Sequence, residues 1–430
     1  MLATNQEHRP RVVVTGLGVL TSNATNIQEF VSSLRGGVSG IKPIRCFDTH
    51  GYCNDKAGVI HDLCPERYGL DPTSDRTEQM VVIAAMQAVQ DAGIVFDHAL
   101  GLRSSVTLGS SIGGWNTYVE TLRSEHNRDP GTRFQGPYSC IEDIPPCRIA
   151  AKLCDHFGIT GGTISTVTAC AAGANSIACG VDMIRLGRCD VVLATAVDPL
   201  CELSFSGFNI LMAMSSSASR PFDRNRDGLL VGEGSGALVL EKLEHALARN
   251  ARIYCEIPGY GLSNDAYHAT QPDPEAGGAC RAISRALTDA AVSPCEINYI
   301  NAHGTSTKYN DLMELKAIQK IYGDVAHKIP ISSIKSMIGH TLGAAGTIEA
   351  VATILALHHR FLPPTINFKD PIDGFDYDFV PQSRETGQAT LMASHSFGFG
   401  GNSACILFRE SPILSTPSTP TPLIFAEAAF

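Results

Sequence analysis

Several features of secreted, membrane or nucleic-acid-binding chains are missing from this 430-residue sequence. It holds no run of about twenty apolar residues, and its start, MLATNQEHRPRVVVTG, has no apolar segment ahead of a cleavage site. The fourteen cysteines form no CxxC pair and no Cys/His metal spacing. We therefore expect no membrane span, no signal peptide, no metal, and free thiols in a reducing cytoplasm. The net charge of −10 argues against nucleic acid as the main partner.

What is present describes an ordinary globular protein, with 44% hydrophobic and 18% charged residues. The length predicts one or two large domains. Strand-like and helix-like segments alternate, which indicates the α/β class. We expect one half over residues 1–260 and a second over 261–410. The proline- and threonine-rich residues 411–430 are interpreted as a disordered tail.

The stretch Thr163 to Met183, TISTVTACAAGANSIACGVDM, contains the best candidate for a nucleophile. Its β-branched start predicts a buried strand, and the small residues that follow lead into a helical apolar pattern. Cys170 therefore falls at a strand-to-helix turn. Unpaired N–H groups and the positive end of the helix dipole favour a thiolate there, so we expect a lowered pKa for Cys170.

Two histidines lie in motifs of the same small-residue character, NAHGTST at 301–307 and KSMIGHTLGAAG at 335–346. The unit around His340 repeats the order of strand, small residues and helix seen around Cys170. Such self-similarity indicates two related α/β halves packed face to face. We expect their helix N-termini to meet at one site that contains Cys170, His303 and His340.

Two other motifs resemble ligand sites without completing them. A strand is predicted at 11–15, and Gly16-Leu17-Gly18 predict a turn toward a helix near 26–35. This order is half of a dinucleotide-binding fingerprint, but Thr21 stands at the position of the third glycine. Residues 223–228 imitate the start of a calcium loop, but Glu233 comes one position early. We expect neither a nucleotide nor calcium.

The remaining elements follow from periodicity and from start and stop residues. Asp75 and Gly93 bound a predicted amphipathic helix. Residues 123–147 are polar and irregular, which predicts a surface or subunit contact. Further strands are expected at 104–108, 190–196, 236–240, 253–262, 299–302 and 329–333, and further helices at 277–291, 311–321 and 343–358.

Taken together, the motifs resemble the β-ketoacyl-acyl-carrier-protein synthases of the elongating type, the synthase II-like members of the thiolase superfamily. The resemblance spans roughly residues 10 to 408. It implies a thiolase-like fold of two related halves in a five-layered αβαβα arrangement. It rests on TACAAG around Cys170, PFDRNRDG and GEGSG at 221–236, NAHGTST, KSMIGHTLGAAG, and SFGFGG at 396–401.

The resemblance implies a decarboxylative Claisen condensation between an acyl thioester held on Cys170 and a malonyl thioester. Two histidine N–H donors, from His303 and His340, would stabilise the enolate left by CO₂ loss. Lys335 would polarise the site, with Glu349 in support, although the two could form only an internal ion pair. No cofactor is implied, because phosphopantetheine arrives on the acyl carrier protein.

Further roles also come from the resemblance alone. The N–H groups of Cys170 and Phe399 would form the oxyanion hole, and Phe399 would gate the acyl pocket. Thr305 and Thr307 match pantetheine-binding positions, or cap the turn after His303. Ile112 would lie at the floor of the acyl pocket, or be a core aliphatic.

The sequence also departs from the family pattern around the site entrance. His395 stands beside Ser394 where the family usually has Asn, which puts a monovalent cation in doubt. The other departures are Lys308, Met212 and the Asn402-Ser403 pair. They leave open whether the pathway makes primary fatty acids or a specialised polyketide or polyene.

Three competing functions are less consistent with these residues. A thiolase needs a second cysteine in the loop that here carries Phe399, and Cys405 lies beyond that loop. A chain-length factor, the non-catalytic partner of a ketosynthase, lacks the nucleophile. A papain-like hydrolase needs a local sequence that is absent around Cys170. The family implies a homodimer, and a heterodimer with a chain-length factor stays open.

Overall fold

The computed structural model describes residues 9–126 and 145–411. All of the predicted tail at 411–430 except its first residue, and most of the irregular segment at 123–147, lie outside this range. The first residues of that segment belong to helix α4 (Trp115–His126), so here the prediction of irregular structure was wrong. No helix in the described ranges is long and apolar enough to cross a membrane.

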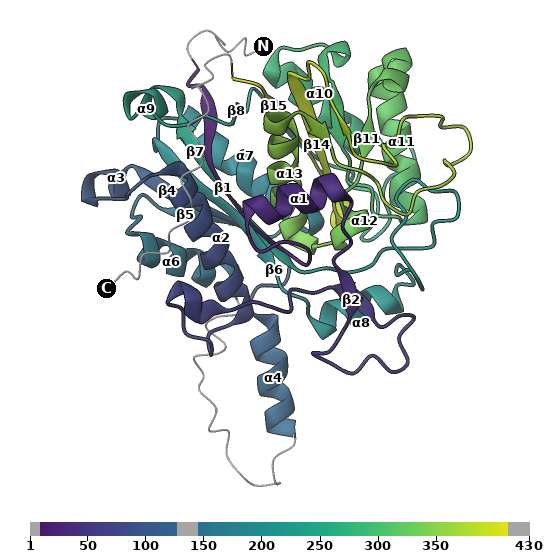
Figure 1. The fold of residues 1–430 in the computed structure, drawn as a ribbon, viewed down its shortest axis with the longest axis horizontal. Coiled ribbons are helices and arrows are strands. Elements are labelled where there is room, and N and C mark those ends of the chain that lie inside the picture. Colours follow the sequence, from purple (N-terminus) through teal and green to yellow (C-terminus); the bar gives the residue numbers. More distant parts are fainter. Residues whose placement is uncertain (1–8, 127–144, 412–430) are drawn as a thin grey trace.

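Two sets of strands form the framework (Figure 1). The first runs in the order β5-β4-β6-β7-β1, and the second in the order β15-β14-β10-β11, with β9 also paired to β15. Strand β8 pairs with both β1 and β15 and so joins the two sets. The bounds are β1 Val12–Thr21, β4 Ser104–Gly109, β5 Thr163–Thr166, β6 Val191–Asp198, β7 Gly234–Lys242, β8 Cys255–Glu256, β9 Tyr260–Asn264, β10 Tyr299–Asn301, β11 Ile331–Ser332, β14 Leu391–Phe397 and β15 Asn402–Arg409.

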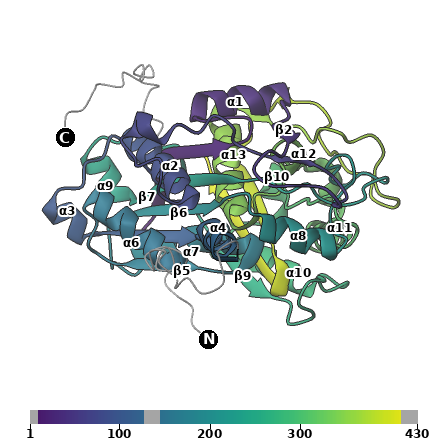
Figure 2. The ribbon, with the colours of Figure 1, turned by 90° about the horizontal axis from the view of Figure 1, so that it is seen from below.

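Helices cover both sets of strands on both faces, giving the five layers (Figures 1 and 2). Helices α7 (Ala172–Arg185) and α13 (Ala345–His359) form the central layer between the two sets. Helices α2 (Arg76–Ala92) and α6 (Pro146–Phe157) cover the outer face of the first set. Helices α10 (Gly277–Ala290) and α11 (Lys308–Tyr322) cover that of the second. The predicted five-layered α/β arrangement is confirmed.

Shorter elements complete the described fold. The two residues predicted to bound helix α2 are confirmed. Asp75 accepts a hydrogen bond from Thr77 N–H, and Gly93 ends the helix in the left-handed region. The other elements are α1 Ile27–Gly36, β2 Ile41–Pro43, β3 Lys56–Gly58, α3 His98–Leu102, α8 Glu202–Ile210, α9 Leu243–Ala248, α12 Lys335–Ile338, β12 Phe361–Leu362 and β13 Arg384–Glu385.

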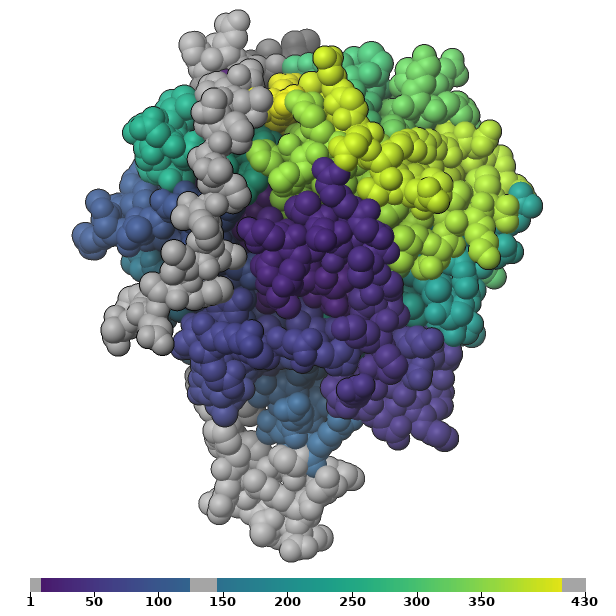
Figure 3. All heavy atoms as spheres, viewed as in Figure 1, coloured from purple at the N-terminus to yellow at the C-terminus, as the bar shows by residue number. Residues whose placement is uncertain are grey.

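The N-terminal helix α1 contacts the C-terminal half. Figure 3 shows the earliest described residues beside chain from beyond residue 350 on one face. Arg35 donates to the carbonyl of His359 at 2.8 Å, and its guanidinium lies 4.5 Å from the centre of the Phe361 ring. The start of the chain therefore packs against the C-terminal half. The proposed division into two halves at residue 260 stays a prediction.

The expected turn at Gly16-Leu17-Gly18 is wrong, because both glycines lie inside β1. Helix α2 passes so close to this strand that side chains have no room. A Cβ on Gly16 would lie 2.1 Å from the Ala88 carbonyl oxygen, and one on Gly18 would lie 1.9 Å from that of Ala84. The two glycines therefore serve helix–strand packing and not a phosphate-binding turn.

Two predicted strands also differ from the structure. Strand β5 is half-exposed and not buried, because it ends the strand order and pairs only with β4. The strand expected at 253–262 is divided into β8 and β9. Pro258 lies at the break, where it cannot donate to a sheet ladder.

Candidate active site

Cys170 lies in a 3₁₀ turn, Ala169–Ala171, directly before α7. The turn begins with Ala169 at a positive φ of 49°, and the Cys170 residue is 7% exposed. Burial raises the pKa of Cys170 to about 11, opposed by the charge of Lys335 and by the N–H groups of Phe399 and Cys170 itself. The expected lowering of the pKa is wrong for this enclosed site, where desolvation outweighs the donors.

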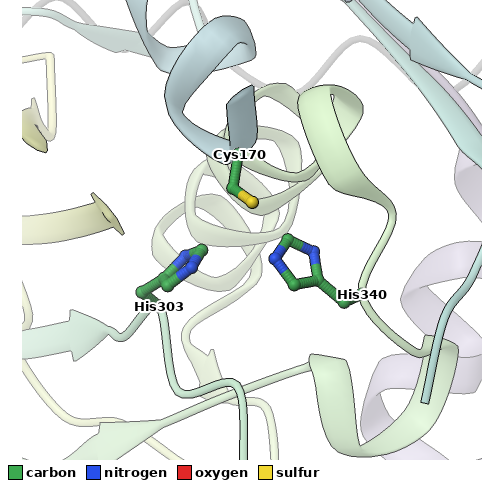
Figure 4. A group of neighbouring side chains, drawn as sticks. All are labelled: Cys170, His303 and His340. Atoms are coloured by element: carbon green, nitrogen blue, oxygen red, sulfur yellow. The ribbon is translucent and has the colours of Figure 1, made fainter. Parts of the chain in front are cut away.

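His303 and His340 face Cys170 from two loops of the second half (Figure 4). One nitrogen of each ring and the sulfur of Cys170 all lie within 4.8 Å of one another. The two rings meet edge to face, with centroids 5.2 Å apart. The fold thus brings together the three residues that the sequence placed at one site.

The protonation of both rings can be inferred from their hydrogen bonds. His340 Nδ1 accepts the N–H of Leu342 at 3.1 Å, and His303 Nδ1 lies 3.2 Å from the ammonium of Lys335. Because both Nδ1 atoms accept, the proton of each neutral ring is on Nε2. Burial, with the charge of Lys335, holds both histidine pKa values well below the usual range, so both rings are neutral N–H donors.

A cysteine and two histidines can also bind zinc. A metal bound at Nε2 would need the ring proton on Nδ1, where it would point at the N–H of Leu342 in His340 and at the Lys335 ammonium in His303. The donor set therefore fits a metal poorly, and it suits an anionic oxygen better.

Lys335 is buried at the start of α12, and its three N–H donors have three acceptors. They are His303 Nδ1, the carbonyl of His303 at 2.7 Å, and the carboxylate of Glu349. Burial raises the pKa of Glu349 to about 7 although Lys335 opposes this. Lys335 thus fixes both the ring orientation and the tautomer of His303.

Two buried carboxylates that the sequence analysis did not single out hold the His303 loop. Glu314 on α11 accepts the N–H groups of His303 at 2.9 Å and Gly304 at 2.8 Å. Asp311, one turn earlier, accepts the N–H of Ser306 at 3.1 Å. The only available signal was two acids three residues apart on one face of a helix that follows the histidine motif.

Phe399 begins a short 3₁₀ turn, Phe399–Gly401, that faces the thiol. Its ring contacts that of Phe208, with centroids 5.7 Å apart. A Cβ on Gly398 would lie 3.1 Å from the Cys170 nitrogen, so the missing side chain lets the Phe399 backbone reach the sulfur. Gly400 has a φ of 74°, which a side chain would strain.

The remaining candidates lie around this centre. The hydroxyl groups of Thr305 and Thr307 are 2.8 Å apart, and Thr307 N–H donates to Thr305 at 3.3 Å, which is the expected turn bond. Ile112 is half-buried, and its N–H donates to Asp198 at 2.9 Å. The substrate roles of these three residues stay predictions.

His395 and Met212, two of the departures, differ in burial. Both ring nitrogens of His395 lack a hydrogen-bond partner, and its Nδ1 lies 3.4 Å from Glu314 Oε1 in the interior. Met212 is 88% exposed with a positive φ of 52°. The expected position around the site entrance is therefore wrong for His395, which is buried behind His303, whereas Met212 lies on the surface.

The fold and the Cys-His-His centre together define a thiolase-like condensing protein. Residues 9–246 match the N-terminal domain of β-ketoacyl synthases, and residues 254–369 match their C-terminal domain. The chain belongs to the β-ketoacyl synthase family, which confirms the resemblance drawn from its motifs.

Relatives match over almost the whole chain. The 3-oxoacyl-[acyl-carrier-protein] synthase 2 of Coxiella burnetii is 39% identical over 93% of this chain and 98% of its own length. That of Synechocystis is 38% identical over 94% and 98%. Among solved structures, the ishigamide ketosynthase/chain length factor is similar with a TM-score of 0.86 and 38% identity over 94% of this chain and all of its own. A type II polyketide ketosynthase in complex with its acyl-carrier protein has the same TM-score and coverage at 33% identity.

Proposed function

We propose that this chain catalyses decarboxylative condensation of an acyl thioester with malonyl-acyl-carrier protein, in fatty acid or polyketide synthesis. The single observation that carries the proposal is the centre of Cys170, His303 and His340 within 4.8 Å. It pairs a sulfur nucleophile with two neutral N–H donors, which is what acyl transfer followed by enolate formation requires.

In the first step, the sulfur of Cys170 attacks the carbonyl carbon of the acyl thioester. The N–H groups of Cys170 and Phe399, which already face the sulfur, receive the developing oxyanion. The carbon–sulfur bond to the carrier's pantetheine then breaks, and the leaving sulfur takes up the proton lost by Cys170. Thr305 and Thr307 bind the pantetheine arm in this proposal, and Phe399 gates the pocket.

In the second step, the malonyl carboxylate leaves as CO₂ and its electron pair forms an enolate. The Nε2–H groups of His303 and His340 donate to the enolate oxygen. The enolate carbon attacks the acyl group on Cys170, and the thiolate that leaves takes a proton from solvent. Lys335 and Glu349 keep Nδ1 of His303 an acceptor throughout. No cofactor takes part in the proposed steps.

The alternative of a non-catalytic chain-length factor is disfavoured by the complete site. A thiolase mechanism is disfavoured by the position of Cys405, which is fully buried within β15 and paired with His395 of β14. We also propose a cytoplasmic location, consistent with the absence of disulfides among the thirteen described cysteines.

The test is the intact mass of the full chain after incubation with an acylated carrier protein. One acyl group should be added to the wild type and to Cys405→Ala, but not to Cys170→Ala. CO₂ release from malonyl-carrier protein should follow. An adduct that persists in Cys170→Ala, or one lost only in Cys405→Ala, would contradict the proposal.

We further propose that two subunits pair along β5. This edge strand is half-exposed, and Val167 directly after it is 60% exposed. Helix α4 projects from the same half, with Leu122 49% exposed (Figure 1). The pair is a homodimer unless a homologous chain-length factor replaces one copy.

Sedimentation at micromolar concentration tests the subunit pairing. The wild type should be a dimer, and Val167→Asp should weaken it. Val95→Asp, at an 82% exposed valine outside β5, is the control and should not. A monomeric wild type would contradict the proposal, and co-purification of a second homologous chain would replace the homodimer by a heterodimer.

A further inference from the structure

Asp198, the last residue of β6, is a fully buried carboxylate that the mechanism does not use. Burial raises its pKa to about 6, opposed by hydrogen bonds from Ser110, Ile112, Gly343 and Ser111. An ionised group removed from water in this way needs several donors to persist. Its partners therefore indicate what the carboxylate is for.

The two oxygens of Asp198 bind two separate segments of chain. Oδ1 accepts the Ser110 hydroxyl at 2.7 Å, the N–H of Ser111 at 3.0 Å and the N–H of Ile112 at 2.9 Å. Oδ2 accepts the N–H of Gly343 at 2.6 Å and also that of Ser111 at 3.0 Å. One carboxylate thus joins the loop at 110–112 to the turn that follows His340.

This turn also fixes the ring of His340. The N–H of Leu342 donates to His340 Nδ1, and the next N–H, that of Gly343, donates to Asp198. A Cβ on Gly343 would lie 2.7 Å from Asp198 Oδ2, so a side chain would push the carboxylate away. A shift of the 110–112 loop is therefore transmitted through Asp198 to the turn that orients His340.

We propose that Asp198 is a positioning residue that couples the acyl-pocket loop to His340, so that the acyl chain bound at Ile112 affects the malonyl step. This inference rests on the proposed function, which places the acyl chain at Ile112 and the enolate at His340. A second consequence concerns the thiol. Besides burial, the negative charge of Asp198 raises the pKa of Cys170.

The test compares three variants of the full chain. Asp198→Asn places an amide where two segments of N–H donors converge, so one donor faces the NH₂ group. Ser110→Ala removes two hydrogen bonds on the pocket side only, the one its hydroxyl donates to Asp198 and the one it accepts from Gly113 N–H. It replaces a small residue at little risk to folding. Asp190→Asn is the control, because Asp190 lies just before the same strand but pairs with Arg103 at the surface.

Two rates are measured for each: malonyl decarboxylation with malonyl-carrier protein, and acylation of Cys170 with short and long acyl carriers. Asp198→Asn should lose about tenfold or more in decarboxylation, as expected for a hydrogen bond to a charged group. Ser110→Ala should lower both rates by a smaller factor, and Asp190→Asn neither. Alkylation of Cys170 by iodoacetamide should reach half-maximal rate at lower pH in Asp198→Asn.

Decarboxylation at the wild-type rate in Ser110→Ala with altered acylation would overturn the coupling, because the two segments would then act independently. An unchanged alkylation profile in folded Asp198→Asn would overturn the placement of its charge at the thiol. If the wild type itself neither acylates nor decarboxylates, the proposed function fails instead. If Asp198→Asn does not fold, the two rates measured for Ser110→Ala alone test the coupling.

Discussion

The two halves contain nearly the same turn at the centre of the molecule, TACAAG at 168–173 and TLGAAG at 341–346. Each is a 3₁₀ turn whose first residue has a positive φ, 49° at Ala169 and 52° at Leu342. Each leads directly into one of the two central helices, α7 and α13. The two halves therefore share the same backbone conformation at this turn.

The last glycine of each turn lets the two helices cross closely. A Cβ on Gly173 would lie 2.8 Å from the nitrogen of Thr347, and one on Gly346 would lie 2.6 Å from that of Ala174. Neither position accommodates a side chain. The glycines thus bring both helix N-termini, with their unpaired N–H groups, to the same site.

The halves differ at the middle of the turn, where Cys170 corresponds to Gly343. The N–H of Cys170 faces its own sulfur and is available for an oxyanion. The N–H of Gly343 is occupied by the carboxylate of Asp198. One backbone geometry therefore gives an open anion site in the first half and an anion site filled by the protein itself in the second.

The largest expected effect comes from replacing Cys170, the nucleophile that distinguishes the first turn from the second. In Cys170→Ala, condensation should fall by at least about a thousandfold, because no other group holds the acyl chain. Malonyl decarboxylation should continue, since His303 and His340 remain. The measurements are intact mass and CO₂ release, and equal loss of both activities would contradict the separation of the two steps.

The next effect concerns the donors of the second half. His303→Ala and His340→Ala should each lower malonyl decarboxylation by about 10²–10³-fold, the usual loss for one oxyanion donor. Cys170 should still be acylated, because its own donors come from the backbone. Wild-type CO₂ release in both variants would show that these histidines have another role.

The carboxylate that fills the second anion site should affect the pH dependence of stability. The pKa of Asp198 rises from 3.8 to about 6 on folding, so its contribution is present below pH 4 and lost as the pH rises through 6. The wild type should lose about 3 kcal/mol relative to Asp198→Asn over this range. Urea unfolding at pH 4 and pH 7 measures this change, and a constant difference would contradict it.

Gly343→Ala would give the second turn a side chain where the first carries its nucleophile. Its Cβ would meet Asp198 Oδ2 and the Ser111 nitrogen, each at 2.7 Å. We expect a loss of about 1–3 kcal/mol in the free energy of unfolding, as for other additions to packed sites. Gly387→Ala is the control for denaturation, because nothing lies within 4 Å of its Cβ and its φ lies outside the left-handed region. A Gly343 variant no less stable than this control would mean that the turn tolerates a side chain.

The sequence was sufficient for the features whose signals are local. A cysteine at a strand-to-helix turn, two histidines among small residues, and Asp75 and Gly93 at the ends of a helix were all read correctly. Asp198 and Glu314 were not, because their partners lie far away along the chain and a lone acid has no local pattern. The high pKa of Cys170 was missed for the same reason, since burial is a property of the whole fold.

Predictions from local sequence also failed where tertiary packing overrode the conformational preference of the residues. Gly16 and Gly18 were expected to turn the chain, and instead they let α2 approach β1. The β-branched run at β5 was expected to be buried, although its position at the end of the strand order leaves it half-exposed. The roles of Thr305, Thr307 and Ile112 in substrate binding stay predictions from family resemblance.

The smallest expected effect lies at the loop joined to the second turn. Ile112→Phe adds volume at a half-buried site whose backbone is held by Asp198, so the loop cannot move freely. The added ring should cost about 1–3 kcal/mol if the walls stay in place, and this cost should fall mainly on long acyl chains. Acylation of Cys170 should therefore shift toward short chains by roughly tenfold for each 1.4 kcal/mol. Ile94→Phe, at a buried position against α2, is the control for a general packing defect and should change no chain-length preference. A uniform loss across all chain lengths in Ile112→Phe would place Ile112 in the core and not in the acyl pocket.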